Sequence, residues 1–195
     1  MTTPATTPSS SGGEQDQPWY WAQFEPGRRK DVRMPPGGDL AALRLGLTVA
    51  AGQAPQMWPF YRTRVDDALA SRGQVPDRLV AEHMSLALFA SHQQGQSRLM
   101  HRRGVRLGTA TRALHDRFSQ EGVNSRMAAA AQARSMNAVF YHLRGLVSQL
   151  AVAGQPLDYT RLLADLRSWP FPESRARAVR TWGSDYHVWT AAPAN

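Results

Sequence analysis

Hydrophobic residues recur every three or four positions along most of the chain from Asp39 onward, which is the spacing of one face of an α-helix. The clearest case is residues 135–150, and its apolar stripe consists of Met136, Val139, Phe140, Leu143, Leu146, Val147 and Leu150. We find no convincing alternation of the kind that marks a half-buried strand. The sequence therefore predicts an all-α fold.

Capping and helix-breaking residues indicate where the other helices begin. Asp39 follows the break at residues 35–38 and is placed to cap one helix. Residues 58–70 predict a second helix, and Pro76 suits the first turn of a third. Asp158 is placed to cap a helix after the predicted stop of the 135–150 helix.

Tryptophans indicate where the core lies. Trp182 and Trp189 share one face of a last helix, so we expect them to be buried. Trp19 and Trp21 precede any regular pattern, and we expect them to hold the N-terminal segment against the body of the protein.

The chain is expected to form two helical bundles packed together. Residues 1–13 are rich in Thr, Pro, Ser and Gly, which predicts a disordered tail over residues 1–18. An N-terminal lobe is expected over residues 19–121 and a C-terminal lobe over residues 122–195, with the seam at residues 122–124.

Positive charge is concentrated in one third of the chain. Residues 91–156 carry nine arginines against Asp116 and Glu121, so they hold +7 of the chain's net charge of +8. A GC-rich genome would explain why Lys30 is the only lysine, but it does not explain this concentration. Guanidinium groups stay charged and bind phosphate through a planar fork, so the charge indicates a polyanionic partner.

The composition indicates the cellular compartment and excludes several kinds of site. The absence of cysteine excludes disulfides, thiolate zinc sites and cysteine nucleophiles, and it fits a reducing cytosol. No apolar run approaches the roughly 18 residues of a membrane span, and the first residues lack the pattern of a signal peptide. We therefore expect a cytoplasmic protein that does not bind membranes.

Catalytic motifs are weak throughout. The six histidines are scattered, and Glu82-His83 lacks the second histidine that a helical zinc protease needs. Residues 104–108 lack the lysine of a phosphate-binding loop. The sequence therefore predicts no enzymatic activity, no metal and no cofactor.

Four strings of residues follow one another along the chain in a characteristic order and spacing. They are residues 38–45 with 58–61, residues 104–110, residues 143–147, and residues 156–169 leading into Arg177, Trp182 and Tyr186. Together they resemble the small subunit of the type I-E CRISPR surveillance complex Cascade, the family often called CasB. Two positions depart from the family pattern, since Leu45 and Thr109 stand where the family has arginine.

The resemblance implies a non-catalytic protein present in two copies. Its expected partners are guide RNA, target DNA, the guide-bearing backbone subunits, the large subunit and a second copy of itself. Base pairing would read the sequence, while the protein would hold sugar-phosphate chains, including the displaced strand.

The candidate nucleic-acid-binding residues are arginines, and Arg44 enters by resemblance alone. The complete set is Arg44, Arg98, Arg102, Arg103, Arg106, Arg112, Arg126, Arg134 and Arg144. Arg117 is ranked last because Asp116 or Glu121 is expected to neutralise it. Arg161 is expected to form local ion pairs with Asp158 and Asp165.

Two other functions remain open at this level. A stand-alone helical DNA-binding regulator would read bases from an exposed recognition helix, although residues 128–133 are poor in base-reading side chains. An adaptor would use the same arginines to bind an acidic protein, because carboxylates and phosphates both attract guanidinium.

Overall fold

The computed structural model describes residues 18–27, 34–65 and 67–187. Within these ranges the chain is helical, with no strand and one isolated bridge between His101 and Leu157. The elements are η1 (Tyr20–Phe24), α1 (Gly37–Arg44), η2 (Leu45–Leu47), η3 (Pro55–Phe60), α2 (Asp67–Ala70), α3 (Asp77–Gln93), α4 (Leu107–Arg112), η4 (Ala113–Asp116), α5 (Gln120–Gln132), α6 (Met136–Ala153), α7 (Tyr159–Ser168) and α8 (Pro172–Tyr186). The all-α prediction is confirmed. Residues 1–17 of the expected tail lie outside the described residues.

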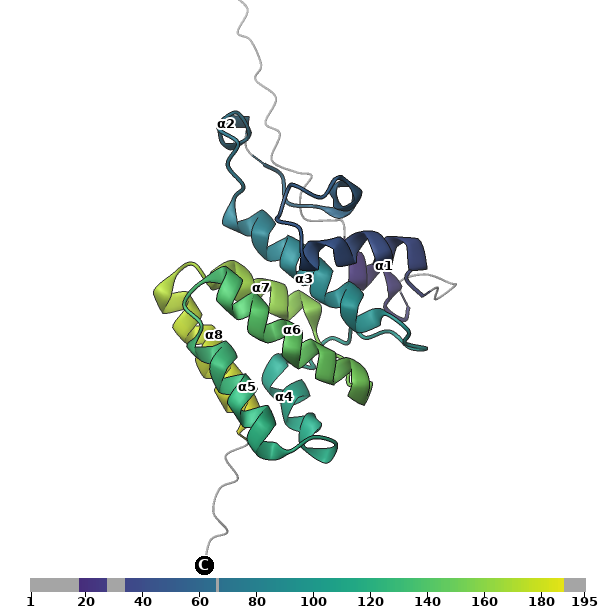
Figure 1. Ribbon diagram of the computed structural model, residues 1–195, viewed down its shortest axis with the longest axis vertical. Coiled ribbons are helices and arrows are strands. Elements are labelled where there is room, and N and C mark those ends of the chain that lie inside the picture. The colour runs from purple at the N-terminus through teal and green to yellow at the C-terminus, as the bar shows by residue number, and fades with distance from the viewer. Residues whose placement is uncertain (1–17, 28–33, 66, 188–195) are drawn as a thin grey trace, which may run out of the picture.

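Helix α3 joins the two bundles of the fold (Figure 1). It packs against α1 and η2 on one side and against α6 and α7 on the other. Helix α4 lies against α8, and α5 lies against α6. The upper bundle in Figure 1 is therefore built around α1 and α3, and the lower one from α4 to α8.

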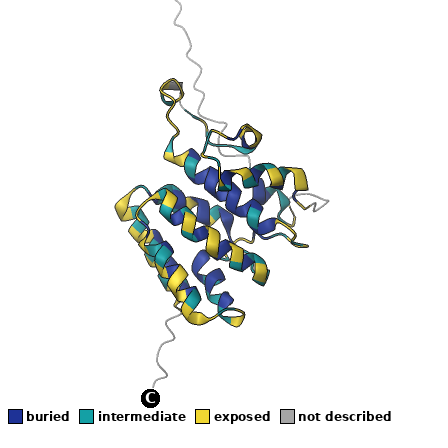
Figure 2. Ribbon diagram, in the orientation of Figure 1, coloured by how far each residue is buried: buried dark blue, intermediate teal, exposed yellow. Residues whose placement is uncertain are grey.

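Helix α3 is covered on both sides, and Figure 2 shows it as the darkest helix of the molecule. Residues 81–90 are all buried. Three of them are polar, and each has a hydrogen-bond partner: Glu82 accepts from backbone N–H groups, the ring of His83 bonds Tyr61 and Val49, and Ser85 donates to a carbonyl one turn earlier. A buried polar group with partners avoids the cost of desolvation, which is how α3 keeps polar residues inside the core.

The prediction of one helix over residues 58–70 is wrong. Helix η3 ends at Phe60, and the chain is extended at Tyr61. The backbone N–H groups of Arg62 and Thr63 bind the Glu82 carboxylate at 2.7 and 2.8 Å. A carboxylate from α3 therefore takes donors that a helix would have used locally, and only the short α2 follows.

Of the two helix caps predicted from the sequence, one is confirmed and one is wrong. Asp39 does not cap α1, because it lies inside the first turn and accepts a hydrogen bond from the Tyr20 hydroxyl at 2.8 Å. Asp158 is the N-cap of α7, as predicted, and accepts from the N–H of Arg161 at 3.0 Å. The left-handed backbone of Gly154, with φ of 62°, ends α6.

The N-terminal segment is held by Trp21, as the sequence predicts. Its ring is fully buried against Phe89 and Tyr159, and its indole N–H donates to Thr160 at 2.9 Å. Trp182 is also in the core, as predicted, whereas Trp189 lies outside the described residues.

Helix α5 runs without interruption through residues 121 and 122, where the sequence places the seam between the lobes. The division at that position stays a prediction.

Candidate nucleic-acid interface

Helix α6 organises five of the arginines of the basic region. Ser135 caps this helix by accepting from the N–H of Ala138 at 3.2 Å, and the buried stripe of Val139, Leu143, Leu146, Val147 and Leu150 holds it against the core. The opposite face is left to solvent. We call the set along this helix the α6 arginine line; its members are Arg98, Arg117, Arg126, Arg134 and Arg144.

Each member of the line reaches α6 from a different place. Arg134 stands just before the cap of the helix, and Arg144 lies on the helix itself. Arg126 comes from α5 and lines the same groove as Arg144. At the far end, Arg117 donates to the carbonyl oxygen of Val152 at 2.8 Å, and Arg98 donates to that of Gly154.

The prediction for Arg117 is therefore wrong. Its guanidinium binds the C-terminal end of α6 rather than Asp116 or Glu121. The free carbonyl groups of a helix end carry partial negative charge, which favours cations there. Arg117 thus belongs with the exposed arginines, although the sequence ranks it last.

The line has little compensating negative charge. Helix α6 contains no Asp or Glu, and α5 contains only Glu121. All five arginines are exposed, and none forms an ion pair with a carboxylate of the described residues. Their hydrogen bonds go to neutral backbone carbonyls, so their charge remains available to a ligand.

A second group, Arg102, Arg103 and Arg106, lies at the start of α4. This segment runs beside the connection between α6 and α7, since the N–H of Arg102 donates to the carbonyl of Leu157 at 3.1 Å. Arg103 binds Glu25 at 2.8 Å, and Arg106 lies 3.6 Å from Asp185. Two of these three charges are therefore offset by carboxylates, and they contribute less positive potential than the sequence implies.

Glu25 also explains how the N-terminal segment meets this group. Burial raises the pKa of Glu25, but hydrogen bonds from Arg103 and His101 outweigh it, so that its pKa is lowered overall. The same carboxylate raises the pKa of Arg103 through its hydrogen bond and its charge. Arg103 thus forms a structural ion pair with Glu25 and is also a candidate phosphate ligand.

The remaining two candidates are more isolated. Arg44 is the last residue of α1, and the bond from Arg144 to the carbonyl of Leu47 at 3.2 Å brings the middle of α6 to the segment that follows it. Arg112 is the last residue of α4 and is half-buried. Neither has an ion-pair partner in the described part of the chain.

Arg161 forms no salt bridge with Asp158 or Asp165, the partners predicted for it, although its charge partly offsets the burial that raises the pKa of Asp165. The Asp158 carboxylate accepts from the backbone N–H groups of Gly104 and Arg161, and that of Asp165 accepts from the indole of Trp182 at 2.7 Å. Both carboxylates therefore have tertiary roles that their spacing from Arg161 does not reveal.

Tyr141 is a residue that the sequence reading missed. It lies on the outward face of α6, and 71% of its surface is exposed. The signal was its position, because Tyr141 falls opposite the apolar stripe that the helical spacing predicts.

Three histidines are built into the core rather than arranged for chemistry. The N–H of His83 donates to the carbonyl of Val49 at 2.9 Å, so its other ring nitrogen accepts from the Tyr61 hydroxyl at 2.7 Å. His101 accepts the N–H of Tyr159 at 3.1 Å. Burial lowers the pKa of both histidines, and lowers that of His92 to about 4. Among the described residues, no three metal-ligating side chains gather into a possible metal site.

These buried histidines predict acid sensitivity. The folded state keeps His92 neutral, whereas the unfolded chain takes up a proton below about pH 6.5, so stability is complete above that pH and falls toward pH 4. Between pH 7 and 4.5 we expect His92 alone to cost about 2 kcal/mol. Urea unfolding of the wild type and of His92→Gln at both pH values checks this. Their difference in unfolding free energy should shift by about that amount in favour of the variant, and a constant difference would contradict the assignment.

Among the described residues, no helix has both the length and the apolar character needed to cross a membrane.

Proteins of known family and structure share this helical arrangement. A model of the family described as CRISPR-associated protein Cse2 matches residues 39–187. A crystal structure of CasB from Thermobifida fusca is 29% identical with a TM-score of 0.61, and the match covers 77% of this chain and 84% of that chain. A CRISPR-associated protein of the Cse2 family from Thermus thermophilus is 23% identical with a TM-score of 0.58, over 76% of this chain and 85% of that chain.

A second structure from Thermus thermophilus, described as CasB, is 24% identical with a TM-score of 0.57, over 76% of this chain and 84% of that chain. A comparison with curated proteins gives no significant match. The resemblance seen in the four sequence strings is confirmed by the family match and by these folds. Because that match spans most of the 195 residues, the chain belongs to the Cse2 family of CRISPR-associated proteins.

Proposed function

We propose that this protein is a non-catalytic, nucleic-acid-binding subunit of a cytoplasmic Cascade complex. It holds guide and target strands, including the displaced DNA strand, by their sugar-phosphate backbones. Its expected protein partners are the guide-bearing backbone subunits, the large subunit and a second copy of itself. The observation that carries the proposal is the α6 arginine line, which is exposed and has no ion-pair partner among the described residues.

The hydrogen bonding of the line supports contact with phosphate. Arginine has five N–H donors, and Arg117, Arg126 and Arg144 are each seen to give one to a backbone carbonyl. Such a bond orients the guanidinium while leaving other donors for a phosphate oxygen. A row of pre-oriented guanidinium groups suits a ligand with regularly spaced negative charges.

Contact with the backbone predicts binding without sequence preference. Phosphates are the same at every step of a nucleic acid, so these contacts position a strand but do not read it. In the proposed complex the guide RNA supplies the sequence reading. Neutralising about four to six phosphates per copy gives a log-log slope of affinity against salt of about −3 to −5.

The first experiment measures binding of the full chain to random-sequence DNA over a salt series. We expect weak binding, indifferent to sequence, with the slope given above. A sharp preference for one duplex site would favour the stand-alone regulator. Absence of binding at low salt would favour the adaptor for an acidic protein.

A charge-reversal variant tests the position of the interface. Arg126→Glu, Arg134→Glu and Arg144→Glu together should reduce the steepness of the salt slope by about 2, because three phosphate contacts are lost. The matched control reverses Arg64, Arg72 and Arg78, which are exposed and lie outside the line. The control has the same net charge and should keep the wild-type slope. Equal losses in the two variants would show that net charge matters and the α6 line does not.

A further inference from the structure

A groove of about 510 Å³ crosses the outward face of α6 at the middle of the arginine line. Arg126 of α5 stands on one side of it, and residues of η2 and α3 stand on the other. Tyr141, His142, Arg144, Gly145 and Ser148 of α6 line the part between them. The volume falls in the range of roughly 300 to 1,000 Å³ that is usual for sites holding small organic groups.

Tyr141 is the aromatic group of this groove, and its ring is open to solvent. The residue one turn later is Gly145, where a Cβ atom would have nothing within 4 Å, and Ser148 lies a further turn on. Small residues therefore leave the space beside the ring empty. On its other side the ring of His142 meets it nearly at a right angle, with ring centroids 5.4 Å apart and 78° between the planes.

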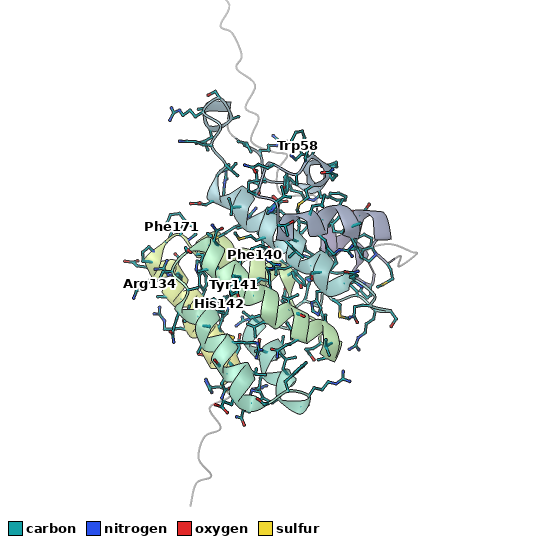
Figure 3. All side chains as sticks on the ribbon, viewed as in Figure 1. Trp58, Arg134, Phe140, Tyr141, His142 and Phe171 are labelled. Atoms are coloured by element: carbon teal, nitrogen blue, oxygen red, sulfur yellow. The ribbon has the colours of Figure 1, made fainter. Side chains whose placement is uncertain are left out.

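Figure 3 shows Arg134, Tyr141 and His142 in the same part of the view, over the start of α6, while Trp58 lies by the other bundle. Tyr141 is 71% exposed on a helix whose opposite face is buried, so its ring is available to a ligand in the groove. Arg126 and Arg144 line the same groove, and no carboxylate of the described residues lines it.

We propose that this groove binds an unpaired nucleotide of single-stranded DNA, with the base stacked on Tyr141 and the neighbouring phosphates held by Arg126 and Arg144. This inference rests on the proposed function and names the form of nucleic acid that the site selects. A groove lined by one aromatic ring and two cations suits a base and its neighbouring phosphates. A basic peptide is disfavoured by the two arginines, and an acidic one leaves the open ring without a partner.

The ring distinguishes single strands from duplexes for a physical reason. In a duplex both faces of each base are covered by neighbouring bases, so no base face is available to Tyr141. An unpaired base can leave its stack and lie on an aromatic side chain, which is worth about 1 to 3 kcal/mol per base in single-strand binding proteins. The arginines contribute to both forms, whereas Tyr141 contributes to the single strand alone.

The test compares a 15-nucleotide oligo-dT with a random 15-base-pair duplex, each titrated with the full chain at low salt. Tyr141→Ala should weaken binding to oligo-dT by about 5- to 100-fold and leave the duplex affinity within about twofold. Tyr141→Phe keeps the ring and should retain wild-type binding. Trp58→Ala removes another exposed aromatic side chain, away from the groove, and should also retain it.

The outcomes separate this inference from the proposed function. If wild type binds both ligands with a steep salt slope but Tyr141→Ala weakens neither, or weakens both equally, the groove is not a stacking site while the arginine interface stands. If wild type binds neither ligand, the proposed function itself fails. Tighter binding of oligo-rU than of oligo-dT would overturn the assignment to DNA.

Discussion

Replacing Gly108 by alanine is expected to lower the free energy of unfolding by about 3 kcal/mol or more. A Cβ atom at this position would lie 2.3 Å from the carbonyl oxygen of Trp182 and 2.7 Å from the backbone nitrogen of Tyr186. Both are backbone atoms of α8, so the clash is relieved only if α4 and α8 separate. Chemical unfolding followed by circular dichroism measures the loss.

Gly145→Ala is the matched control, because it also replaces a glycine inside a helix. A Cβ atom there meets nothing within 4 Å, and alanine favours the helix by about 1 kcal/mol over glycine. We therefore expect opposite signs for the two substitutions. Wild-type stability of Gly108→Ala would show that α4 and α8 do not approach each other so closely.

Gly108 belongs to the string at residues 104–110, which resembles the family pattern, and its contact with α8 explains what this string does. Gly108 is the second residue of α4, and its geometry gives it a packing role. Gly108 lets α4 approach α8, and this contact holds the start of α4, where Arg106 lies beside Asp185. The string therefore fixes the position of cationic residues without contacting a ligand through Gly108.

Replacing Glu82 by alanine is expected to cost about 3 kcal/mol of unfolding free energy, because it removes the carboxylate that accepts from two part-buried backbone N–H groups. Glu82 is fully buried in α3, and its oxygens bind the N–H groups of Arg62 and Thr63. Urea unfolding measures the loss, and amide hydrogen exchange at residues 62 and 63 should become faster.

Two variants control this prediction. Glu82→Gln keeps one accepting oxygen and should lose about half as much stability. Glu121→Ala removes an exposed glutamate from the first turn of α5 and should change stability by about 0.5 kcal/mol or less. If Glu82→Ala is as mild as Glu121→Ala, the carboxylate does not hold the 61–65 segment in place.

Helix α6 is an element that the sequence predicted well. Its apolar stripe and the predicted stop after it are local signals, and they gave the helix and its buried face directly. The concentration of arginine in residues 91–156 and the four family-like strings were likewise visible in the chain, since each depends on residues close together in sequence.

The failures have one cause in common. The helix expected over residues 58–70 is replaced by extended chain because Glu82, about 20 residues later, takes its backbone donors. Arg103 is partly neutralised by Glu25, which lies 78 residues earlier. Neither partner could be read from helical spacing, because both contacts form only when distant segments pack together.

Spacings of three and four residues encode helices and their buried faces, so the amino-acid order alone was enough for the fold class. The cationic middle third and the family resemblance were also determined by the sequence, because each depends on residues close together in the chain. Which cations stay free is a property of the folded chain. Packing brought Arg117 and Arg98 to the carbonyl end of α6, gave Arg103 and Arg106 carboxylate partners, and left Tyr141 open beside Gly145. These arrangements depend on contacts between segments far apart in sequence, which no local pattern encodes.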